Sequence, residues 1–182
     1  MAAADYPRVH LKTAAELRRW LAENHATAPG LWLVSYRAST GRPAIDYDDA
    51  VREALCYGWI DSVVKPLDAE RVISLYTPRR AGGAWSRSNK ERVAELIKSG
   101  RMRPPGLAKI EQAKRDGTWT LLDSVERLEV PADLGRALGA AGRKRFDALT
   151  PGKKKEHLAA LVTAKKPETR AKRIADIVRA LR

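Results

Sequence analysis

The segment YDDAVREALCYGWIDS, residues 47–62, contains the change from helix to strand that decides the fold. Asp46 stands directly before it, where an aspartate can cap a helix by accepting hydrogen bonds from backbone amides. Gly58 ends the helix, because glycine readily adopts the left-handed conformation at a helix C-terminus. The apolar and β-branched residues of 59–64 follow at once. The segment therefore predicts a helix that leads directly into a strand.

Outward from this segment, two further apolar stretches at 31–36 and 71–76 predict strands. Together with 59–64 they are expected to form a small, mainly antiparallel sheet. A capping box at Thr13 predicts a helix before the sheet, and everything after residue 88 carries helical signals. The expected fold class is α+β, with a small sheet and flanking helices in the N-terminal half and an all-helical C-terminal part.

The same signals suggest how the chain is divided. We expect an α+β domain over residues 1–117, a linker with polar character over 118–130, and a basic helical domain over 131–182. Within the last of these, proline, glycine and apolar spacing predict helices at about 131–140, 143–149, 150–164 and from Pro167 onward.

Composition restricts the class of protein. With 182 residues, 44% hydrophobic and 31% charged, the chain can bury a core and is not disordered by composition. It has no run of the ~18 apolar residues that a membrane helix needs and no signal-peptide pattern at its start, so we expect a cytoplasmic protein without a membrane span. Its single cysteine, Cys56, excludes an internal disulfide and is expected to be a buried, structural thiol.

The charge is strongly positive and unevenly distributed. The net charge is +13, and residues 136–182 contain 14 Lys/Arg and four Asp/Glu, which is a net charge of +10. Such a region attracts polyanions and is expected to bind nucleic acid non-specifically at low salt. The alternative is a solvated helical surface whose lysines neutralise helix C-termini.

Motifs for the common catalytic and cofactor sites are missing from the sequence. The three histidines stand far apart, and no HExxH motif, cysteine pair or Cys/His cluster suggests a zinc site. The sequence also lacks a GxSxG elbow, a Walker A loop and a GxGxxG turn. We therefore predict no metal, no cofactor and no catalytic residue.

The segment TPRRAGGAWSRSNK, residues 77–90, is the most suggestive of function. Two arginines precede a glycine pair and the start of a helix, where backbone amides and guanidinium groups can bind one anion together. Trp85 offers a flat face on which a ligand could stack. The alternative is structural, with Ser88 capping the helix, Trp85 in the core and the arginines solvated.

Four stretches of the sequence resemble one known family. They are Trp20-Leu21 with His25 and the following GLWL at 30–33, the segment at 47–62, YTPRRAGGAWSRSNKERVAELIKSGRM at 76–102, and AKKPETRAKRI at 164–174. In this order they resemble the YdeI/OmpD-associated (bacteriocin-protection) family over about residues 10–180, with an OmdA-type helical region at the C-terminus.

This resemblance implies a role in stress response, as tolerance to bacteriocins or cationic antimicrobial peptides. It provides no catalytic residue to transfer to this chain. A protein with a net charge of +13 repels cationic peptides, which argues against direct sequestration. An indirect route, through an anionic partner or a regulatory contact, fits the charge better.

The resulting hypothesis is a non-enzymatic binding module with an anion-binding cleft between sheet and helices. Its arginines would bind the anion, its tryptophans would form the sides of the cleft, and Asp61 would orient an arginine. The predicted lining comprises Trp59, Asp61, Ser62, Arg79, Arg80, Trp85, Ser86, Asn89 and Arg92. Three alternatives remain: these residues form a buried ion-pair and aromatic core, the basic C-terminal helices bind nucleic acid, or the protein is an enzyme for an anionic small molecule with Asp61 as its titratable group.

Overall fold

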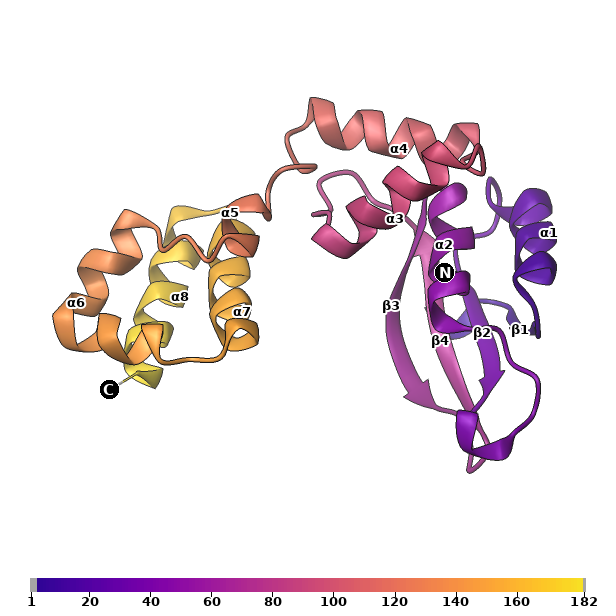
Figure 1. Cartoon of the computed structure of the whole chain (residues 1–182), viewed down its shortest axis with the longest axis horizontal. Coiled ribbons are helices and arrows are strands. Elements are labelled where there is room, and N and C mark those ends of the chain that lie inside the picture. Colours follow the sequence, from indigo (N-terminus) through magenta and orange to yellow (C-terminus); the bar gives the residue numbers. More distant parts are fainter. Residues whose placement is uncertain (1–2, 182) are drawn as a thin grey trace. The chain divides into compact units, whose positions relative to one another are not determined.

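The computed structural model describes residues 3–181 and consists of two compact units. The first unit runs to Gly83 and includes Ser88–Asp116, and the second comprises Ala84–Arg87 and the chain from Gly117 onward. The sheet lies in the first unit, and all regular elements after it are helices (Figure 1). The predicted α+β class, with an all-helical C-terminal part, is confirmed.

The bounds of the elements follow in chain order. They are η1 (Ala3–Asp5), β1 (Arg8–His10), α1 (Ala14–Asn24), β2 (Leu31–Tyr36), η2 (Ala38–Thr40), α2 (Tyr47–Cys56), β3 (Trp59–Pro66), β4 (Arg71–Pro78), α3 (Arg87–Lys98), α4 (Pro104–Arg115), α5 (Asp123–Glu126), α6 (Ala132–Asp147), α7 (Pro151–Val162) and α8 (Pro167–Ala180).

The sheet has four strands in the order β1-β2-β4-β3. β4 pairs antiparallel with both β2 and β3, so the expected mainly antiparallel sheet is confirmed. β2 has the predicted bounds, and β3 and β4 each continue two residues further than predicted. β1 was not predicted. It is three residues long and pairs in parallel with β2 at the sheet edge, which leaves too few residues for an alternating pattern.

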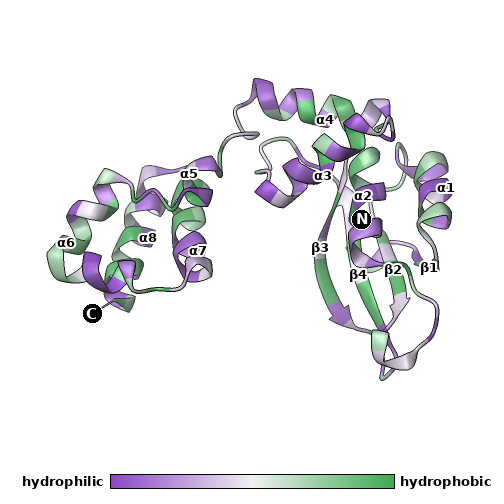
Figure 2. Ribbon diagram, in the orientation of Figure 1, coloured by the Kyte–Doolittle hydropathy of each residue, from purple (hydrophilic) through white to green (hydrophobic). Residues whose placement is uncertain are grey.

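The two faces of the sheet have different neighbours because side chains alternate along each strand. On one face Trp32, Val34 and Ile73 form an apolar cluster, and the ammonium group of Lys65 lies 4.5 Å from the Trp32 ring centroid. The other face is covered by α2 (Figure 1). Figure 2 shows how far apolar residues extend along β3 and β4.

The predicted features of α2 are confirmed. The carboxylate of Asp46 accepts hydrogen bonds from two backbone amides in the first turn, and Gly58 has a left-handed φ of 74°. Cys56 is buried at the helix end, and burial raises the pKa of its thiol to about 11. α4 lies close to this end, since a Cβ on Gly106 would stand 2.4 Å from the carbonyl oxygen of Cys56.

The second unit has its own helical core. The helices expected at 131–140 and 143–149 are joined as α6, which Gly139 interrupts with a φ of 61° and a ψ of −175°. The expected linker at 118–130 contains α5 and contributes Val125 to this core. Figure 2 shows apolar residues on α5 and α7 in this unit.

No helix within residues 3–181 is both long enough and apolar enough to cross a membrane.

Candidate functional site

A cavity of about 240 Å³ lies between α2 and the sheet. The strands supply residues from the face that α2 covers, and the chain between β2 and α2 supplies one end. Leu33 and Ser74 are direct neighbours across β2 and β4, which places both on the cavity side. The lining residues are Leu33, Ser35, Tyr36, Arg37, Ala38, Ile45, Tyr47, Ala50, Val64, Val72, Ser74 and Tyr76.

Tyr76 is the most deeply buried polar side chain of this lining, at 2% exposure. Its hydroxyl forms no hydrogen bond with any group in residues 3–181. The oxygen is not among the fully enclosed polar atoms that lack a partner, so water or a ligand in the cavity can form a hydrogen bond with it. Burial, with the nearby Asp61 carboxylate and Tyr47, raises the pKa of Tyr76, so its phenol is a neutral donor.

Tyr47 and Asp61 form a polar pair beside the cavity. The Tyr47 hydroxyl donates a 2.7 Å hydrogen bond to Oδ2 of Asp61. This bond, together with desolvation and the Asp61 charge, raises the pKa of Tyr47 to about 12. Asp61 is the strand neighbour of Tyr76, and a bulge follows it in β3 before pairing resumes at Val64. Bulges redirect side chains in this way next to binding sites.

Arg37 gives the cavity its charge. It is the only charged residue in the lining, and no carboxylate lines the cavity directly. Within residues 3–181 its guanidinium group forms no ion pair. The remaining lining consists of five hydroxyl-bearing side chains and apolar groups, so the cavity suits a molecule with one negative charge and an apolar body.

The residues predicted from the segment at 47–62 have different surroundings. Trp59 is 1% exposed and packs edge-to-face on Trp20 with ring centroids 5.7 Å apart, so it belongs to the core. Ser62 is exposed, and its hydroxyl donates weakly to the carbonyl of Leu75 at 3.5 Å. Asp61 approaches the cavity through its bond to Tyr47.

The structure separates the two predicted arginines. Arg79 is buried at 7% exposure, and desolvation lowers the pKa of its guanidinium group to about 10 although the Asp61 charge acts in the opposite direction. Its backbone amide donates to the carbonyl of Gly58. Arg80 is exposed. The two side chains therefore have different environments, and they do not form the joint anion site that the sequence suggested.

The other predicted residues fall into two groups. Trp85 and Ser86 lie in the four-residue segment that belongs to the second unit, where Trp85 is buried against Trp119 with centroids 5.0 Å apart. Asn89 and Arg92 lie on α3, and Oδ1 of Asn89 accepts a 3.1 Å hydrogen bond from Arg92.

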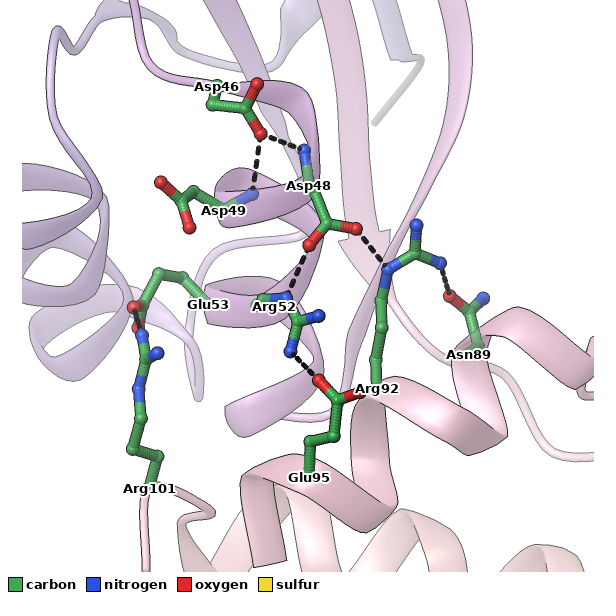
Figure 3. A network of polar contacts seen from close by, with 9 residues as sticks. All are labelled: Asp46, Asp48, Asp49, Arg52, Glu53, Asn89, Arg92, Glu95 and Arg101. Carbon is green, nitrogen blue, oxygen red and sulfur yellow. Dashed lines mark hydrogen bonds and ion pairs between the residues drawn. The ribbon is translucent and has the colours of Figure 1, made fainter. Parts of the chain in front are cut away.

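Arg92 belongs to an ion-pair network that joins α3 to α2. Its Nε donates to Asp48 at 2.7 Å, and Asp48 also pairs with Arg52, which in turn bonds Glu95 at 2.7 Å (Figure 3). These pairs hold the helix whose first turn carries Tyr47. The network thus positions the cavity wall and does not line the cavity.

None of the nine residues that the sequence predicted as site residues is among the residues that line this cavity. Tyr47 has the helical spacing of the core residues of α2, yet it is 54% exposed and its hydroxyl is bonded to Asp61. A signal for the site was available in the strands, because Ser35 and Ser74 place hydroxyls in otherwise apolar segments. Within residues 3–181 no group of three or more His, Cys, Asp and Glu residues could hold a metal ion.

Two families match different parts of the chain. Residues 9–109, more than half of the chain, match the family described as Domain of unknown function (DUF8412). Residues 127–182 match the family described as Bacteriocin-protection, YdeI or OmpD-Associated (OmdA). The expected OmdA resemblance is thus confirmed for the C-terminal part. No curated protein and no solved structure matches the chain.

Proposed function

We propose that this chain, which belongs to the family described as Domain of unknown function (DUF8412), is a binding module that takes a small organic acid into the cavity between α2 and the sheet. The observation that supports this most is Tyr76, a lining residue that is 2% exposed and whose hydroxyl forms no hydrogen bond with a group in residues 3–181. A ligand oxygen in the cavity would accept the missing hydrogen bond.

The lining specifies the class of ligand. Arg37 supplies one positive charge, and a guanidinium group binds a carboxylate through two parallel hydrogen bonds. Leu33, Ile45 and Val72 offer apolar contacts for the rest of the molecule. A monocarboxylic acid with a short apolar body satisfies both requirements, and a volume of about 240 Å³ limits it to a small molecule.

The tyrosines suit binding better than catalysis. With its pKa raised to about 12, Tyr47 is protonated at neutral pH and donates a hydrogen bond to Asp61. A general base would need a pKa near the working pH. We therefore favour a non-enzymatic role, and the competing enzyme hypothesis would have to rest on Asp61 as the reactive group.

The OmdA match connects this binding to protection. That family's description names bacteriocin protection, and we propose that this chain contributes indirectly, as a stress-response module that responds to an anionic ligand. The net charge of +13 supports an indirect route, because it opposes contact with cationic peptides.

The direct test is to locate binding by nuclear magnetic resonance. ¹H–¹⁵N spectra of the whole chain would be recorded with hexanoate and benzoate, and with hexanamide as the uncharged control. We expect saturable shifts at Ser35, Tyr47, Ser74 and Tyr76 with the carboxylates and weaker ones with the amide. Shifts confined to other parts of the chain, or equal shifts with hexanamide, would contradict the proposal.

A second candidate function is polyanion binding by the C-terminal helices. It is favoured by cations that form no ion pair within residues 3–181, namely Arg136, Lys144, Lys165, Lys166 and Lys172. Other cations are already engaged. Lys154 and Arg145, for example, donate to the carbonyls of Asp147 and Leu181 near helix C-termini. The unpaired cations would supply the non-specific attraction to nucleic acid.

A further inference from the structure

A second cavity in the first unit has four arginines in its lining. It has a volume of about 470 Å³ and lies between α1, the C-terminal half of α2 and the connection from α3 to α4. The small side chains of α1 leave the space open. The lining residues are Ala14, Ala15, Arg18, Arg19, Ala22, Glu53, Tyr57, Arg101 and Arg103, none of which lines the cavity between α2 and the sheet.

Glu53 is the only acidic residue of this cavity, and it is 1% exposed. Arg18 binds its carboxylate with two hydrogen bonds, from Nε at 2.9 Å and from Nη2 at 2.7 Å. Arg101 donates to the same carboxylate, and this contact is drawn in Figure 3. One buried carboxylate thus fixes two guanidinium groups from separate elements, each with a side chain that is still 37% exposed.

The charges of the cavity do not balance. Four arginines and one glutamate leave an excess of three positive charges. Arg19 and Arg103 are exposed, and within residues 3–181 neither forms an ion pair. The need to neutralise Glu53 explains Arg18 and Arg101 but leaves the other two unexplained. Like charges held together in a concave site repel one another unless an anion screens them.

The backbone fixes where these cations stand. Arg18 and Arg19 are neighbours on α1, whose capping box at Thr13 defines its first turn. Arg103 precedes α4, and its amide donates to the carbonyl of Cys56 at 3.2 Å. The close approach of Gly106 to the same carbonyl keeps α4 in place. The arginines are therefore carried by packed elements, as a preorganised anion site requires.

We propose that this cavity is a second anion site, specific for a group of two linked phosphates. A single phosphate monoester carries a charge of about −1.5 to −2 at neutral pH and would leave part of the excess uncompensated. Pyrophosphate, or a compound that contains a diphosphate, matches three charges more closely. Its oxygens can accept paired hydrogen bonds from several guanidinium groups. Because the two cavities share no residue, this site does not depend on the organic-acid site.

The test is calorimetric titration of the whole protein with pyrophosphate at fixed ionic strength. We expect saturable binding with one site per chain, weaker binding of inorganic phosphate, and a loss of about tenfold or more in pyrophosphate affinity for each of Arg19→Ala and Arg103→Ala. These two arginines are chosen because they lie outside the Glu53 ion pairs, so the variants should keep the wild-type melting temperature.

The matched control is the double variant Arg8→Ala/Lys98→Ala, which removes two exposed cations of the same unit that lie outside the cavity. It should bind pyrophosphate within about twofold of the wild type, a small residual effect of net charge. The proposal is overturned if the wild type does not bind pyrophosphate, if the Arg19 and Arg103 variants bind undiminished, or if the control loses as much affinity as they do.

Discussion

The hydroxyl of Tyr47, in the first turn of α2, donates a 2.7 Å hydrogen bond to the carboxylate of Asp61, which lies before the bulge in β3. This bond joins the helix that covers the sheet to the strand at the sheet's edge. The Asp61 charge also acts on Tyr76, which lines the cavity, and on Arg79, which does not. The first prediction concerns this bond.

Tyr47 should ionise at a pH of about 12, well above the ordinary value of 10, because ionisation breaks its bond to Asp61. A raised pKa in the folded protein means that the bond's contribution to stability is complete below pH 10 and is lost as the pH rises through 12. The difference between the ultraviolet titration curves of the wild type and of Tyr47→Phe gives the ionisation of the Tyr47 phenol. Asp61→Asn should lower its pKa, and a Tyr47 that titrates near 10 in the wild type would disprove the bond.

The second prediction concerns Gly106, where α4 meets the end of α2. A Cβ at this position would stand 2.4 Å from the oxygen of Cys56 and 2.6 Å from that of Leu55. Gly106→Ala should therefore force the two helices apart and destabilise the first unit by about 1–3 kcal/mol.

Gly135→Ala is the matched control, because nothing lies within 4 Å of a Cβ at that position in α6. It should be neutral or stabilise its helix by about 0.5–1 kcal/mol. Urea denaturation followed by circular dichroism measures both variants. Equal stability of Gly106→Ala and the wild type would contradict the close approach of α4.

The third prediction concerns the two arginines on Glu53. Either Arg18→Ala or Arg101→Ala leaves the other arginine to neutralise the buried carboxylate, so each should cost about 1 kcal/mol or less, given their exposure of 37%. The double variant leaves Glu53 buried without a cation and should cost about 3 kcal/mol or more. In a double-mutant cycle from urea denaturation, the double variant should lose more stability than the two single variants lose in sum. If the losses simply add, Arg18 and Arg101 do not share the neutralisation of Glu53.

These features differ in how far the sequence predicts them. The bounds of β2 and the caps of α1 and α2 depend on neighbouring residues, so local patterns predict them correctly. β1 depends on its pairing with β2 and carries almost no local signal. Arg79 and Arg80 follow the end of β4, where no regular pattern applies, so local sequence could not show that Arg79 would be buried while Arg80 stays exposed.

The cavity was harder to predict for the same reason. Its lining combines positions from β2, β4 and the start of α2, and strand order and register decide which of these face one another. The hydroxyls of Ser35 and Ser74 look like ordinary polar positions until the register places them on the side that α2 covers. Tyr47 has the same helical spacing as the core residues of α2. It is the first residue of that helix, and its hydroxyl bonds to Asp61 in β3.

The fourth prediction tests polyanion binding by the second unit. Replacing Lys144, Lys165, Lys166 and Lys172 with glutamine should weaken non-specific binding to duplex DNA and reduce the dependence of log K on log salt, which is about 0.9 per phosphate contact. Four exposed cations of the first unit, Arg8, Lys12, Lys98 and Arg115, provide the matched control. Fluorescence anisotropy from 50 to 200 mM salt measures both variants. If the control lost as much affinity, binding would reflect net charge and not these helices.

The last prediction concerns the ion pair between the Arg37 guanidinium group and the carboxylate of a ligand. In the wild type hexanoate should bind more tightly than hexanamide by about tenfold, since only the carboxylate can take a charged, paired hydrogen bond from the guanidinium group. Arg37→Ala should bring the two affinities together by weakening hexanoate alone. Arg8→Ala, which removes an exposed cation outside the cavity, should keep the preference.

The most direct test of the organic-acid site is therefore the ratio of the hexanamide and hexanoate dissociation constants, measured by calorimetry on the wild type, Arg37→Ala and Arg8→Ala. The expected ratios are about ten, about one and about ten. A ratio near one in the wild type, or a ratio near ten that survives in Arg37→Ala, would show that the cavity between α2 and the sheet is not an organic-acid site.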